Sequence, residues 1–419
     1  MSEKTLTKMT DLGQLPADWD VVEVGSLCKV HGRIGFRGYT TDYLVPAGQG
    51  ALAIGGKHIT HCVLDLSSPD YISWEKYYES PEIMVKKGDI VVAQRGTLGK
   101  AAIVDREIGP ATINPSLVLL NNIRCNPYYL YYYLISEPVT SKILSQSGLT
   151  SIPMISQKQV EGIKIATPHT SEQNRIAEAL WKMNALISSL DKIILKKRMI
   201  KQGTMQNLLT GKIRLKGFSQ PWEEYRLDDL VTIFKGFGLS KEKLSNNGPF
   251  PCLLYGEIFT TYDTVVDNCA SHTCFNEGIP SKTGDILMPG STTTCGIDLA
   301  KAICVLHDDI LLGGDVVVLR KRDYATYNSY FLAAVLTNIK KREIEQITQG
   351  ITIIHLNTRV LPNITVSLPK DVNEQFKIAS ILSAMDSEIS SIEAERDKYK
   401  NIKQGMMQML LTGQIRLPV

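Results

Sequence analysis

The chain has 419 residues, of which 43% are hydrophobic and 21% are charged, and its formal net charge is +3. These values are typical of a globular protein of two or three domains, each with its own core. No run of about 18 apolar residues is present, which excludes a membrane-spanning helix, and the first ten residues lack the apolar centre of a signal peptide. We therefore expect a cytoplasmic protein with no membrane partner. The mild positive charge permits nucleic-acid binding without requiring it.

Short motifs for metal, hydrolase or ATPase chemistry are missing. Among the eight cysteines, Cys269 and Cys274 are the only close pair, with His272 between them, and no second pair completes a zinc spacing. The seven histidines form no metal or triad spacing. Gly99-Lys100 lacks the flanking glycine and hydroxyl residue of a phosphate-binding loop. We expect reduced, structural cysteines and no metal site.

In chain order, the pattern predicts domain, helix, domain, helix, in the α+β class. Residues 1–167 and 216–368 contain short apolar runs separated by Gly, Asn and Thr turns, which is typical of short strands and helices. Residues 168–215 and 369–419 carry apolar residues at helical spacing instead. The two long helices are expected to separate the two domains.

The two helical segments repeat one another. Glu172–Leu215 aligns without a gap on Glu374–Leu417, 202 residues later, and 23 of the 44 positions are identical. A repeat of this length predicts approximate two-fold symmetry within one polypeptide. If that symmetry holds, the end of the chain lies near Leu15–Trp19, where the first domain begins.

Each copy has a seam of apolar residues spaced alternately four and three apart, as in a heptad repeat. The simplest arrangement packs the seams on each other in an antiparallel coiled coil, with helices of about 55 Å. The alternative is that each helix covers the core of its own domain. We expect Thr170 or Ser171 to cap the first helix, and Asp371 or Asn373 the second. The seam comprises Ile176, Leu180, Met183, Ile187, Leu190 and Ile194, then Ile378, Leu382, Met385, Ile389 and Ile392.

Four glycines occupy matched positions in the two helical segments. Gly211 and Gly413 are typical of a helix C-terminal stop. Gly203 and Gly405 lie inside the predicted helices, where glycine costs about 1 kcal/mol relative to alanine. Their recurrence indicates close approach of the helices or contact with a partner, and a local kink or break is the alternative.

The domains before the helices also repeat, more faintly. Their loops differ in length and chemistry, which is typical of modules that share a scaffold and bind different ligands. The matched pairs include Trp19–Leu27 with Trp222–Leu230, Gly88–Ile90 with Gly284–Ile286, and Gly148–Ile152 with Gly350–Ile354.

This layout resembles the specificity subunit of type I restriction–modification systems over essentially the whole chain. The resemblance rests on Glu172-Gln173 and Glu374-Gln375, each followed by Ile-Ala, and on the twin Gln-Gly-x-Met-Gln-x-Leu-Leu-Thr-Gly endings placed after two variable modules. Gly88-Asp-Ile90, followed by Gly96-Thr-Leu-Gly99-Lys100, is similar to the family's target-recognition domains.

The resemblance implies a role in phage defence as a DNA-reading subunit. Each α/β target-recognition domain would read one half of a bipartite, asymmetric site in double-stranded DNA, and the helices would set the gap between the halves. The subunit is not an enzyme itself. It recruits two modification (methyltransferase) subunits and then restriction subunits, the ATP-dependent translocase and endonuclease. S-adenosylmethionine, ATP and Mg are expected in those partners and not in this chain.

Residues expected to contact DNA lie in loops and carry side chains that suit bases or phosphates. Arginine can pair with guanine and glutamine with adenine, while lysine and hydroxyl groups suit phosphate. In the first module they are Arg33, Arg37, Tyr39, Lys57, Arg95, Thr97, Lys100 and Gln146. In the second they are Lys235, Lys241, Lys243, Tyr255, Ser291, Thr292, Thr293, Thr294, Lys301, Gln349 and Thr352.

Two other functions stay open. A self-contained adenine methyltransferase would use Asn126-Pro-Tyr-Tyr129, which resembles a motif that holds a flipped adenine, and Phe234–Gly238 as a cofactor loop. Against it, tyrosine replaces the second proline, and the matched segment in the other module is Asn328-Ser-Tyr-Phe331. The other alternative is a coiled-coil adaptor that holds two protein partners without reading DNA.

Overall fold

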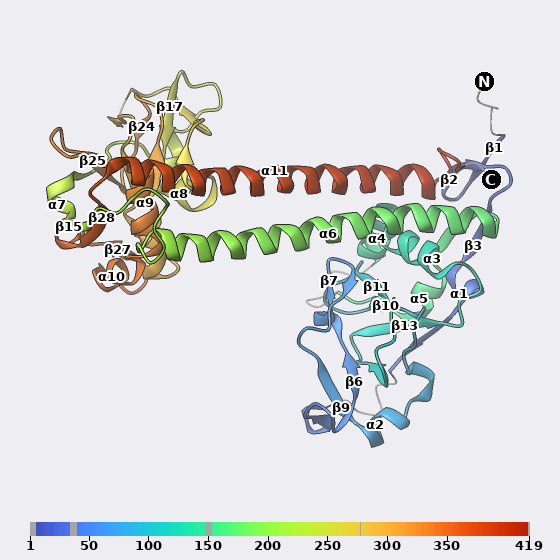
Figure 1. The fold of residues 1–419 in the computed structure, drawn as a ribbon. Helices are drawn as coiled ribbons and strands as arrows, with labels where there is room; N and C mark the ends of the chain where they lie inside the picture. The colour runs from blue at the N-terminus through green and yellow to red at the C-terminus, as the bar shows by residue number, and fades with distance from the viewer. Residues whose placement is uncertain (1–5, 34–39, 147–152, 277, 418–419) are drawn as a thin grey trace. The chain divides into compact units, whose positions relative to one another are not determined.

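The computed structural model describes residues 6–33, 40–146, 153–276 and 278–417. The chain forms two compact units (Figure 1): Met1–Asp191 with Ala394–Val419, and Lys192–Glu393. Each unit holds one mixed domain and part of each long helix, α6 (Thr170–Leu208) and α11 (Val372–Leu411). The predicted α+β class is confirmed, and the compact units divide each long helix between them, unlike the predicted domains.

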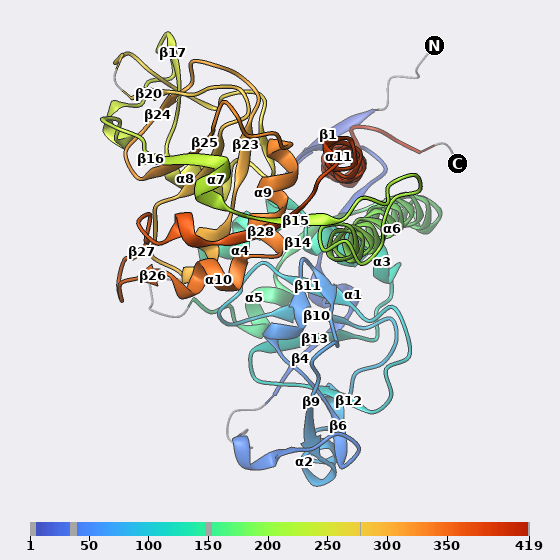
Figure 2. The ribbon, with the colours of Figure 1, turned by 60° about the vertical axis from the view of Figure 1, so that its left-hand side comes forward.

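The first unit is built on two four-stranded sheets, ordered β11-β10-β13-β4 and β12-β6-β9-β5. The second of these sheets, with α2, lies on the side of the unit away from α6 (Figure 2). The strands are β1 (Thr7–Thr10), β2 (Gly13–Pro16), β3 (Asp20–Glu23), β4 (Lys29–Gly32), β5 (Leu44–Val45), β6 (Gly50–Ile54), β7 (Ile59–Thr60), β8 (Val63–Leu64), β9 (Asp70–Ser73), β10 (Ile90–Ala93), β11 (Ala101–Ile103), β12 (Ala111–Ile113), β13 (Leu117–Asn121) and β14 (Lys164–Thr167). The short helices are α1 (Val24–Leu27), η2 (Thr41–Tyr43), η3 (Gly56–His58), α2 (Trp74–Tyr78), η4 (Pro81–Ile83), α3 (Pro127–Leu134), α4 (Glu137–Gln146) and α5 (Gln157–Glu161).

The second unit contains sheets ordered β16-β25-β21-β23-β18, β19-β17-β24-β20 and β22-β27-β26. Its strands are β15 (Trp222–Arg226), β16 (Val231–Lys235), β17 (Phe250–Leu253), β18 (Val265–Val266), β19 (Ser271–Thr273), β20 (Ile279–Pro280), β21 (Ile286–Pro289), β22 (Ser291–Thr292), β23 (Ile303–Val305), β24 (Leu311–Leu312), β25 (Val316–Lys321), β26 (Thr348–Gln349), β27 (Ile354–Leu356) and β28 (Thr365–Pro369). Its short helices are α7 (Leu227–Leu230), η5 (Lys241–Lys243), α8 (Tyr255–Thr260), η6 (Gly296–Ala300), α9 (Ser329–Asn338), α10 (Lys341–Gln346) and η7 (Leu361–Asn363).

The two domains share one scaffold, as the faint sequence repeat predicts. Strands β4, β13, β10 and β11 follow one another in the first unit as β16, β25, β21 and β23 do in the second. In both, an antiparallel strand pair leads into the long helix: β3 with β14, and β15 with β28. The duplicated sequence therefore encodes duplicated topology, and the domains differ mainly in their connections.

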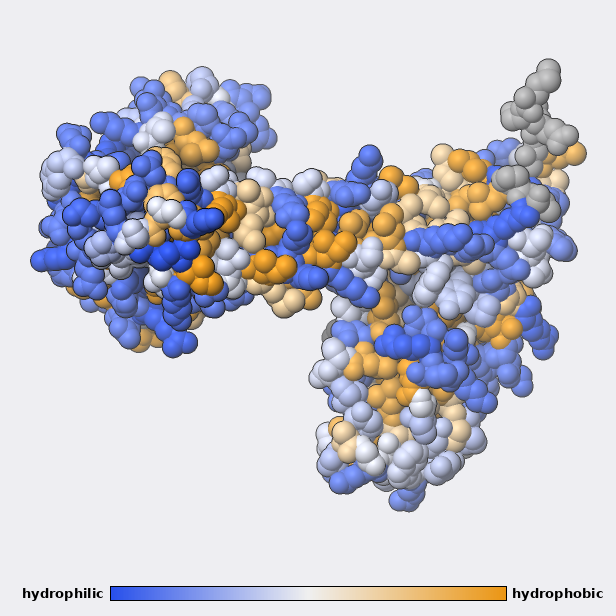
Figure 3. Space-filling model, in the orientation of Figure 1, coloured by the Kyte–Doolittle hydropathy of each residue, from blue (hydrophilic) through white to orange (hydrophobic). Residues whose placement is uncertain are grey.

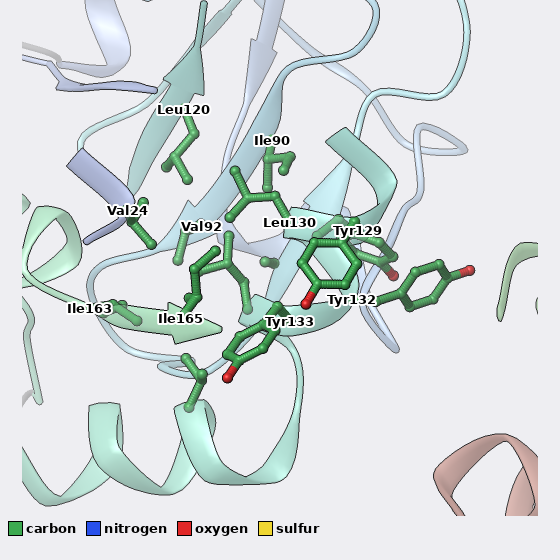
Figure 4. Close-up of a cluster of buried hydrophobic side chains, with 14 of the residues drawn as sticks. Val24, Ile90, Val92, Leu120, Tyr129, Leu130, Tyr132, Tyr133, Ile163 and Ile165 are labelled. Carbon is green, nitrogen blue, oxygen red and sulfur yellow. The ribbon is translucent and has the colours of Figure 1, made fainter. Parts of the chain in front are cut away.

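An aromatic helix, α3, lies at the centre of the first unit's main core (Figure 4). Tyr129 and Tyr132 are fully buried there, and Leu130 of the same helix lies beside Ile90 and Val92 of β10. The Asn126 side chain caps the helix by accepting a hydrogen bond from the Tyr129 backbone N–H at 3.0 Å. A capping asparagine followed by a buried tyrosine explains this segment structurally and leaves it unsuited to holding a flipped adenine.

The second half repeats this cap, because Asn328 accepts from the backbone N–H of Phe331 at 2.8 Å at the start of α9. Gly236, in the segment that resembles a cofactor loop, lies against the backbone of Gly313, where an added Cβ would come within 2.1 Å of the carbonyl oxygen. That glycine is needed for close backbone packing. Neither part of the methyltransferase alternative has the geometry it requires.

The seam residues of each long helix have different surroundings at the start of the helix and farther along it. Ile176 and Leu180 belong to the core of the first domain, and Ile378 and Leu382 to that of the second. Farther along, Ile187, Leu190, Ile194 and Ile389 are buried too, while Met183, Met385 and Ile392 are half-buried. At its start, each helix therefore covers the core of its own domain, and the packing of the two seams in a coiled coil stays a prediction.

Polar contacts fix the direction of the helix pair within each unit. In the first, Lys403 Nζ donates to Asn184 Oδ1 at 2.9 Å, and Arg396 lies 3.4 Å from Asp191. In the second, Lys197 Nζ lies 2.6 Å from Glu388, and Lys201 pairs with Asp386. Residue numbers rise along one helix as they fall along the other, so the pairing is antiparallel, as predicted.

The helix ends were predicted in part. Asp371 caps α11, because its Oδ1 accepts from the Asn373 backbone N–H at 2.9 Å. The prediction for α6 was wrong: the helix begins at Thr170, and the ring of His169, the residue before it, accepts from the Ser171 N–H. A histidine at this position gives little sequence signal, because Ser, Thr, Asp and Asn are the usual caps.

The internal glycines do not mark a break or a close contact. Gly203 and Gly405 lie within the continuous spans of α6 and α11. An added Cβ at either would meet no other described atom within 4 Å. Close helix approach and a helix break are therefore both contradicted, while contact with a partner stays a prediction. Gly211 and Gly413 follow the helices with φ of +68° each, which confirms their role as C-terminal stops.

Asp89 in the first domain and Asp285 in the second occupy matching buried positions but have different partners. Asp285 is bound by Arg320, whose Nη2 lies 2.7 Å from Oδ2. The matching Asp89 accepts a hydrogen bond from the Lys86 backbone N–H, but burial raises its pKa to about 6. The strand registers place Asn121 where the second domain has Arg320. Asp89 is thus a buried carboxyl group without the arginine of its counterpart.

We predict that Asp89→Asn removes a pH-dependent component of stability. Because folding raises the pKa of Asp89, the folded state favours its protonated form. The stability that the protonated Asp89 carboxyl contributes is fully present below about pH 4, the pKa of the group in the unfolded chain. It is lost as the pH rises toward about 6, the pKa in the folded protein. The difference in free energy of unfolding, Asp89→Asn minus wild type, should therefore increase by up to roughly 3 kcal/mol between pH 4 and pH 7. Urea denaturation of both proteins across this pH range measures it.

Asn121→Arg offers a second check, because it gives Asp89 the partner that Asp285 has. Like Asp89→Asn, this variant should lose less stability than wild type as the pH rises, although it keeps the carboxyl group. Parallel pH profiles for wild type and Asp89→Asn would contradict the assignment.

Candidate nucleic-acid interface

The identical residues of the repeat build a joint between domain and helices in each unit. In the first unit, Arg416 Nε and Nη2 donate to the two carboxylate oxygens of Glu172, at 2.5 and 2.7 Å. Trp19 Nε1 donates to the same carboxylate at 3.2 Å, and the guanidinium lies 5.8 Å from the Trp19 ring centre. Glu172, at the start of α6, is only 3% exposed. The joint thus connects the first helix, the segment after the second helix, and the domain.

The second unit has the same joint with the helices exchanged. Arg214, just beyond α6, donates Nε and Nη2 to Glu374 at the start of α11, both at 2.7 Å. Its guanidinium lies 5.9 Å from the ring centre of Trp222. Glu374 is 1% exposed. Each unit therefore needs the beginning of one helix and the end of the other.

The glutamine after each glutamate extends the joint into the domain. Gln173 donates to the Pro168 carbonyl at 2.9 Å and accepts from the Asn126 N–H at 3.0 Å. In the second unit, Gln375 donates to the Pro369 carbonyl at 2.8 Å and accepts from the Asn328 N–H at 2.9 Å. The Glu-Gln pair thereby ties the helix start to both the preceding strand and the capped helix of the domain core.

The glycine stops are part of the same joint. A Cβ on Gly211 would lie 3.2 Å from the Trp222 ring, and one on Gly413 only 2.5 Å from Pro16. Arg416 also binds Asp18 at 2.8 and 3.0 Å, so the last described residues lie against the start of the first domain, as the symmetry predicts.

We predict that Arg416→Ala destabilises the first unit by roughly 2 to 4 kcal/mol, slightly below the usual cost of breaking a buried ion pair because Arg416 is partly exposed. The loss arises from the unpaired Glu172 carboxylate, so adding Glu172→Gln should recover part of it. Urea denaturation of both variants measures the difference.

Lys182→Ala is the matched control for this prediction. Lys182 pairs with Glu178 at 2.7 Å on the same helix, but both side chains are exposed. Loss of such a pair costs at most about 0.5 kcal/mol. Equal effects of Arg416→Ala and Lys182→Ala would show that the joint is not a main support of the unit.

The second unit gathers several predicted DNA-contact residues around the sheet β22-β27-β26. Ser291 and Thr292 form β22, which pairs with β27, and Gln349 ends β26 on the other side of β27. Thr352 lies in the connection between β26 and β27. Strand order therefore brings together residues that are about 60 positions apart in the sequence.

Within this group, some hydroxyls support the surface and others are exposed on it. Ser291 is buried and donates to Asp315 Oδ2 at 2.5 Å, and Lys235 Nζ lies 3.0 Å from Asp315 Oδ1. Burial raises the pKa of Asp315, but the hydrogen bonds from Ser291 and Lys235 outweigh it, so the net shift is downward. Thr293, Thr294, Gln349 and Thr352 are exposed, and Thr292 is buried. Ser291 and Thr292 are thus positioned as internal support.

The remaining candidates of the second unit lie on other elements. Lys241 and Lys243 belong to η5, where Lys243 donates to the Gly238 carbonyl and lies 5.3 Å from the Phe275 ring centre. Tyr255 begins α8 and is exposed. Lys301 is turned inward: its Nζ donates to the Tyr262 carbonyl at 2.6 Å, and burial lowers its pKa. The inward contact argues against Lys301 as a DNA contact.

In the first unit, the loop after β10 matches the Ser291–Thr294 region, because β10 and β21 occupy equivalent places. Arg95 and Thr97 are exposed there, and Lys100 is half-buried. The backbones of Arg95 and Met154 form an isolated antiparallel β-bridge. This pairing resembles that of β22 with β27 in the second unit. Lys57, on η3, is exposed and lies 2.7 Å from Asp70.

Arg33 is the clearest correction among the candidates. It is 5% exposed and donates to the Ile113 carbonyl and Thr112 Oγ1, both at 3.1 Å. These contacts make Arg33 a bridge to β12 inside the domain and contradict a base-reading role in this conformation. Arg37 and Tyr39 lie outside the described residues, as does the side chain of Gln146.

The sequence interpretation missed other residues at the β22-β27-β26 surface. His355 is exposed on β27, and Ile351 and Ile353 project from the connection before it, 97% and 50% exposed. Their proximity to Ser291 depends on strand pairing, which no local sequence pattern reveals.

Two features are absent from the part of the chain that the structure describes. No group of three or more His, Cys, Asp or Glu side chains is placed to hold a metal ion. No described helix is long and apolar enough to cross a membrane.

The family model for the type I restriction modification DNA specificity domain matches residues 65–197 and 219–403 of this chain. The chain belongs to this family. The specificity subunit of the type I restriction enzyme MjaVIII of Methanocaldococcus jannaschii is 27% identical over 363 residues, covering 80% of this chain and 81% of that protein. The putative MjaX specificity subunit of the same organism is 25% identical and covers 98% and 96%.

Two solved structures share the fold. The type I restriction–modification S subunit from M. genitalium gives a TM-score of 0.58 at 17% identity, over 94% of this chain and 96% of that one. A chain from a structure described as explaining complex assembly and conformational transition of a type I system gives 0.54 at 16% identity, over 96% and 99%. The family match and the two relatives from M. jannaschii support the specificity-subunit assignment over the adaptor and methyltransferase alternatives.

Proposed function

We propose that this chain is the DNA specificity subunit of a type I restriction–modification complex, in which each domain reads one half of a bipartite, asymmetric site. The observation that carries the proposal is the duplicated joint. It holds two domains of the same topology on one antiparallel helix pair, with Glu172 and Glu374 in equivalent places.

The difference between the domains supports unlike half-sites. On equivalent loops, the first domain presents Arg95 and Thr97, whereas the second presents Thr293 and Thr294. Arginine and threonine differ in charge and in the bases they suit. A common scaffold with unlike loops is the arrangement that a bipartite, asymmetric target requires.

We further propose that the helices dock two methyltransferase subunits and then restriction subunits. In the second unit, α6 exposes four apolar residues that cover no core: Ile193, Leu195, Met199 and Ile200. Figure 3 shows hydrophobic residues along the helices among hydrophilic ones. The open surface at Gly203 also suits a closely approaching partner.

Catalysis belongs to those partners in this proposal. Methylation and cleavage would occur in the methyltransferase and restriction subunits, which would bind S-adenosylmethionine, ATP and Mg, and the complex would act in the cytoplasm. This chain contributes the choice of DNA sequence and the spacing of the half-sites.

Exchanging one domain tests the proposal directly. We predict that replacing residues 20–165 by the corresponding part of another specificity subunit changes one half-site and leaves the other unchanged. The exchange retains Asp18 and Trp19, so the contacts of these two residues with Arg416 and Glu172 stay in place. Sequencing of methylated adenines in cells that express the complete complex reads both halves at once. A change in both halves would contradict independent reading, and methylation without any sequence preference would favour the adaptor.

A heptad insertion tests the helices as a spacer. Seven residues lengthen a helix by about 10 Å, and one base pair advances about 3.4 Å. We predict that matched heptads after Leu190 and Ile392 widen the gap by about three base pairs or abolish recognition. Insertion after Leu190 alone is the control, because it shifts pairs such as Lys197–Glu388 out of register. An unchanged gap with full activity would exclude a rigid spacer.

A further inference from the structure

The connection between β26 and β27 carries an apolar side chain almost entirely in solvent. Ile351 is 97% exposed, the most exposed of the large hydrophobic side chains described, and Ile353 is 50% exposed. Single exposed apolar residues are common on protein surfaces, so exposure alone decides nothing. The position of Ile351 at the tip of a hairpin, beside the exposed polar residues described above, makes it a candidate for a contact.

The hairpin holds Ile351 in a defined place. Thr348 pairs with Leu356 and Gln349 with His355, so the two strands are in register up to the turn. Gly350 has a φ of +122°, and an added Cβ would come within 2.0 Å of the Ile353 carbonyl oxygen. Only glycine fits this close turn without strain.

The neighbours of Ile351 have the chemistry of base edges and phosphates. Gln349 and Thr352 flank it on the hairpin, and both are exposed. Across β27, β22 leads into the exposed Thr293, with Lys235 held nearby through Asp315. Apart from Ile353, the exposed neighbours on the hairpin are polar, and such a mixture of apolar and hydrogen-bonding side chains suits the mixed edge of a base pair.

We propose that the β26–β27 hairpin enters the major groove and that Ile351 recognises a thymine by contact with its C5-methyl group. The major groove admits a two-stranded β-ribbon, and the thymine methyl is the one apolar group among the base edges there. Gln349 suits the adenine of the same or an adjacent pair, through N6 and N7. This inference rests on the proposed function and names a specificity-determining residue within it.

The sequence of the first module has a matching apolar residue. Leu149 stands between Gly148 and Thr150, as Ile351 stands between Gly350 and Thr352. That segment lies outside the described residues, and the inference is confined to the second module.

The test removes the two partners of the contact one at a time. The purified complex of this chain with its methyltransferase subunits is titrated onto its target duplex, identified from methylated adenines. Each thymine of the half-site read by the second module is replaced by uracil, which lacks only the C5-methyl group. Wild type should lose about fourfold in affinity at one thymine, the value of one buried methyl group. Ile351→Ala should bind the normal target more weakly and be insensitive to the same replacement.

Matched variants separate this contact from general effects. Because Ile351 is almost fully in solvent, alanine there leaves the core intact, and the melting temperature should not change. Ile351→Val keeps an apolar tip and should stay sensitive to uracil. Val360→Ala, which truncates another exposed apolar residue of the second unit, should behave as wild type.

Each other outcome overturns the inference. Equal uracil sensitivity of wild type and Ile351→Ala, or a half-site without thymine, would exclude the methyl contact. Weaker assembly of Ile351→Ala with the methyltransferase in the absence of DNA would assign the tip to a protein partner instead. If the wild-type complex does not prefer its target over a scrambled duplex, the proposed function itself fails. The results for the Ile351 variants bear only on the methyl contact, so the two failures are distinguishable.

Discussion

The buried Glu–Arg pair of each joint is the interaction on which the arrangement of the chain depends. The carboxylate comes from the start of one long helix and the guanidinium from just beyond the end of the other. Neither domain can complete its joint with its own following helix alone. A carboxylate that is 1% to 3% exposed is costly without a partner, so each half requires the other helix. The two-fold character of the chain follows from this exchange.

The joint also shows why certain residues are identical in the two halves. Glu172 and Glu374 need the fork of an arginine, since both oxygens accept in each case. The glycine stops lie where a side chain would strike Trp222 or Pro16. The arginine fork and the space for glycine are both set by the geometry of the joint. Because the joint has the same geometry in both units, the same residues are required in each. An interior position without such a demand can differ: Arg320 pairs with Asp285, whereas Asn121 stands at the matching place in the first domain.

The sequence predicted what depends on local periodicity and on the repeat. The helices, the seam, the glycine stops and the shared scaffold could be read because each is a pattern within one segment or a match between two. The role of Arg33 could not, because its flanking glycines suggest a loop, whereas it follows β4 and reaches Thr112 on a strand about 80 residues away. Likewise, no pattern around Ile351 indicates that β27 pairs with β22. Burial and non-local pairing decide which polar residues reach the surface.

The same distinction governs how specificity can change without loss of the fold. A loop such as Thr293–Thr294 is attached to the end of a core strand, and its exposed side chains contribute little to the core. Substitutions there would alter the surface that we propose to face DNA at small cost in stability, because changes to exposed side chains outside special backbone positions seldom alter the free energy of unfolding by more than about 0.5 kcal/mol. The joint behaves in the opposite way, since loss of the Arg416 guanidinium leaves the buried Glu172 carboxylate without its ion-pair partner. Divergent loops on a joint that both units share are therefore the physical basis on which, in the proposed function, one scaffold would read two unlike half-sites.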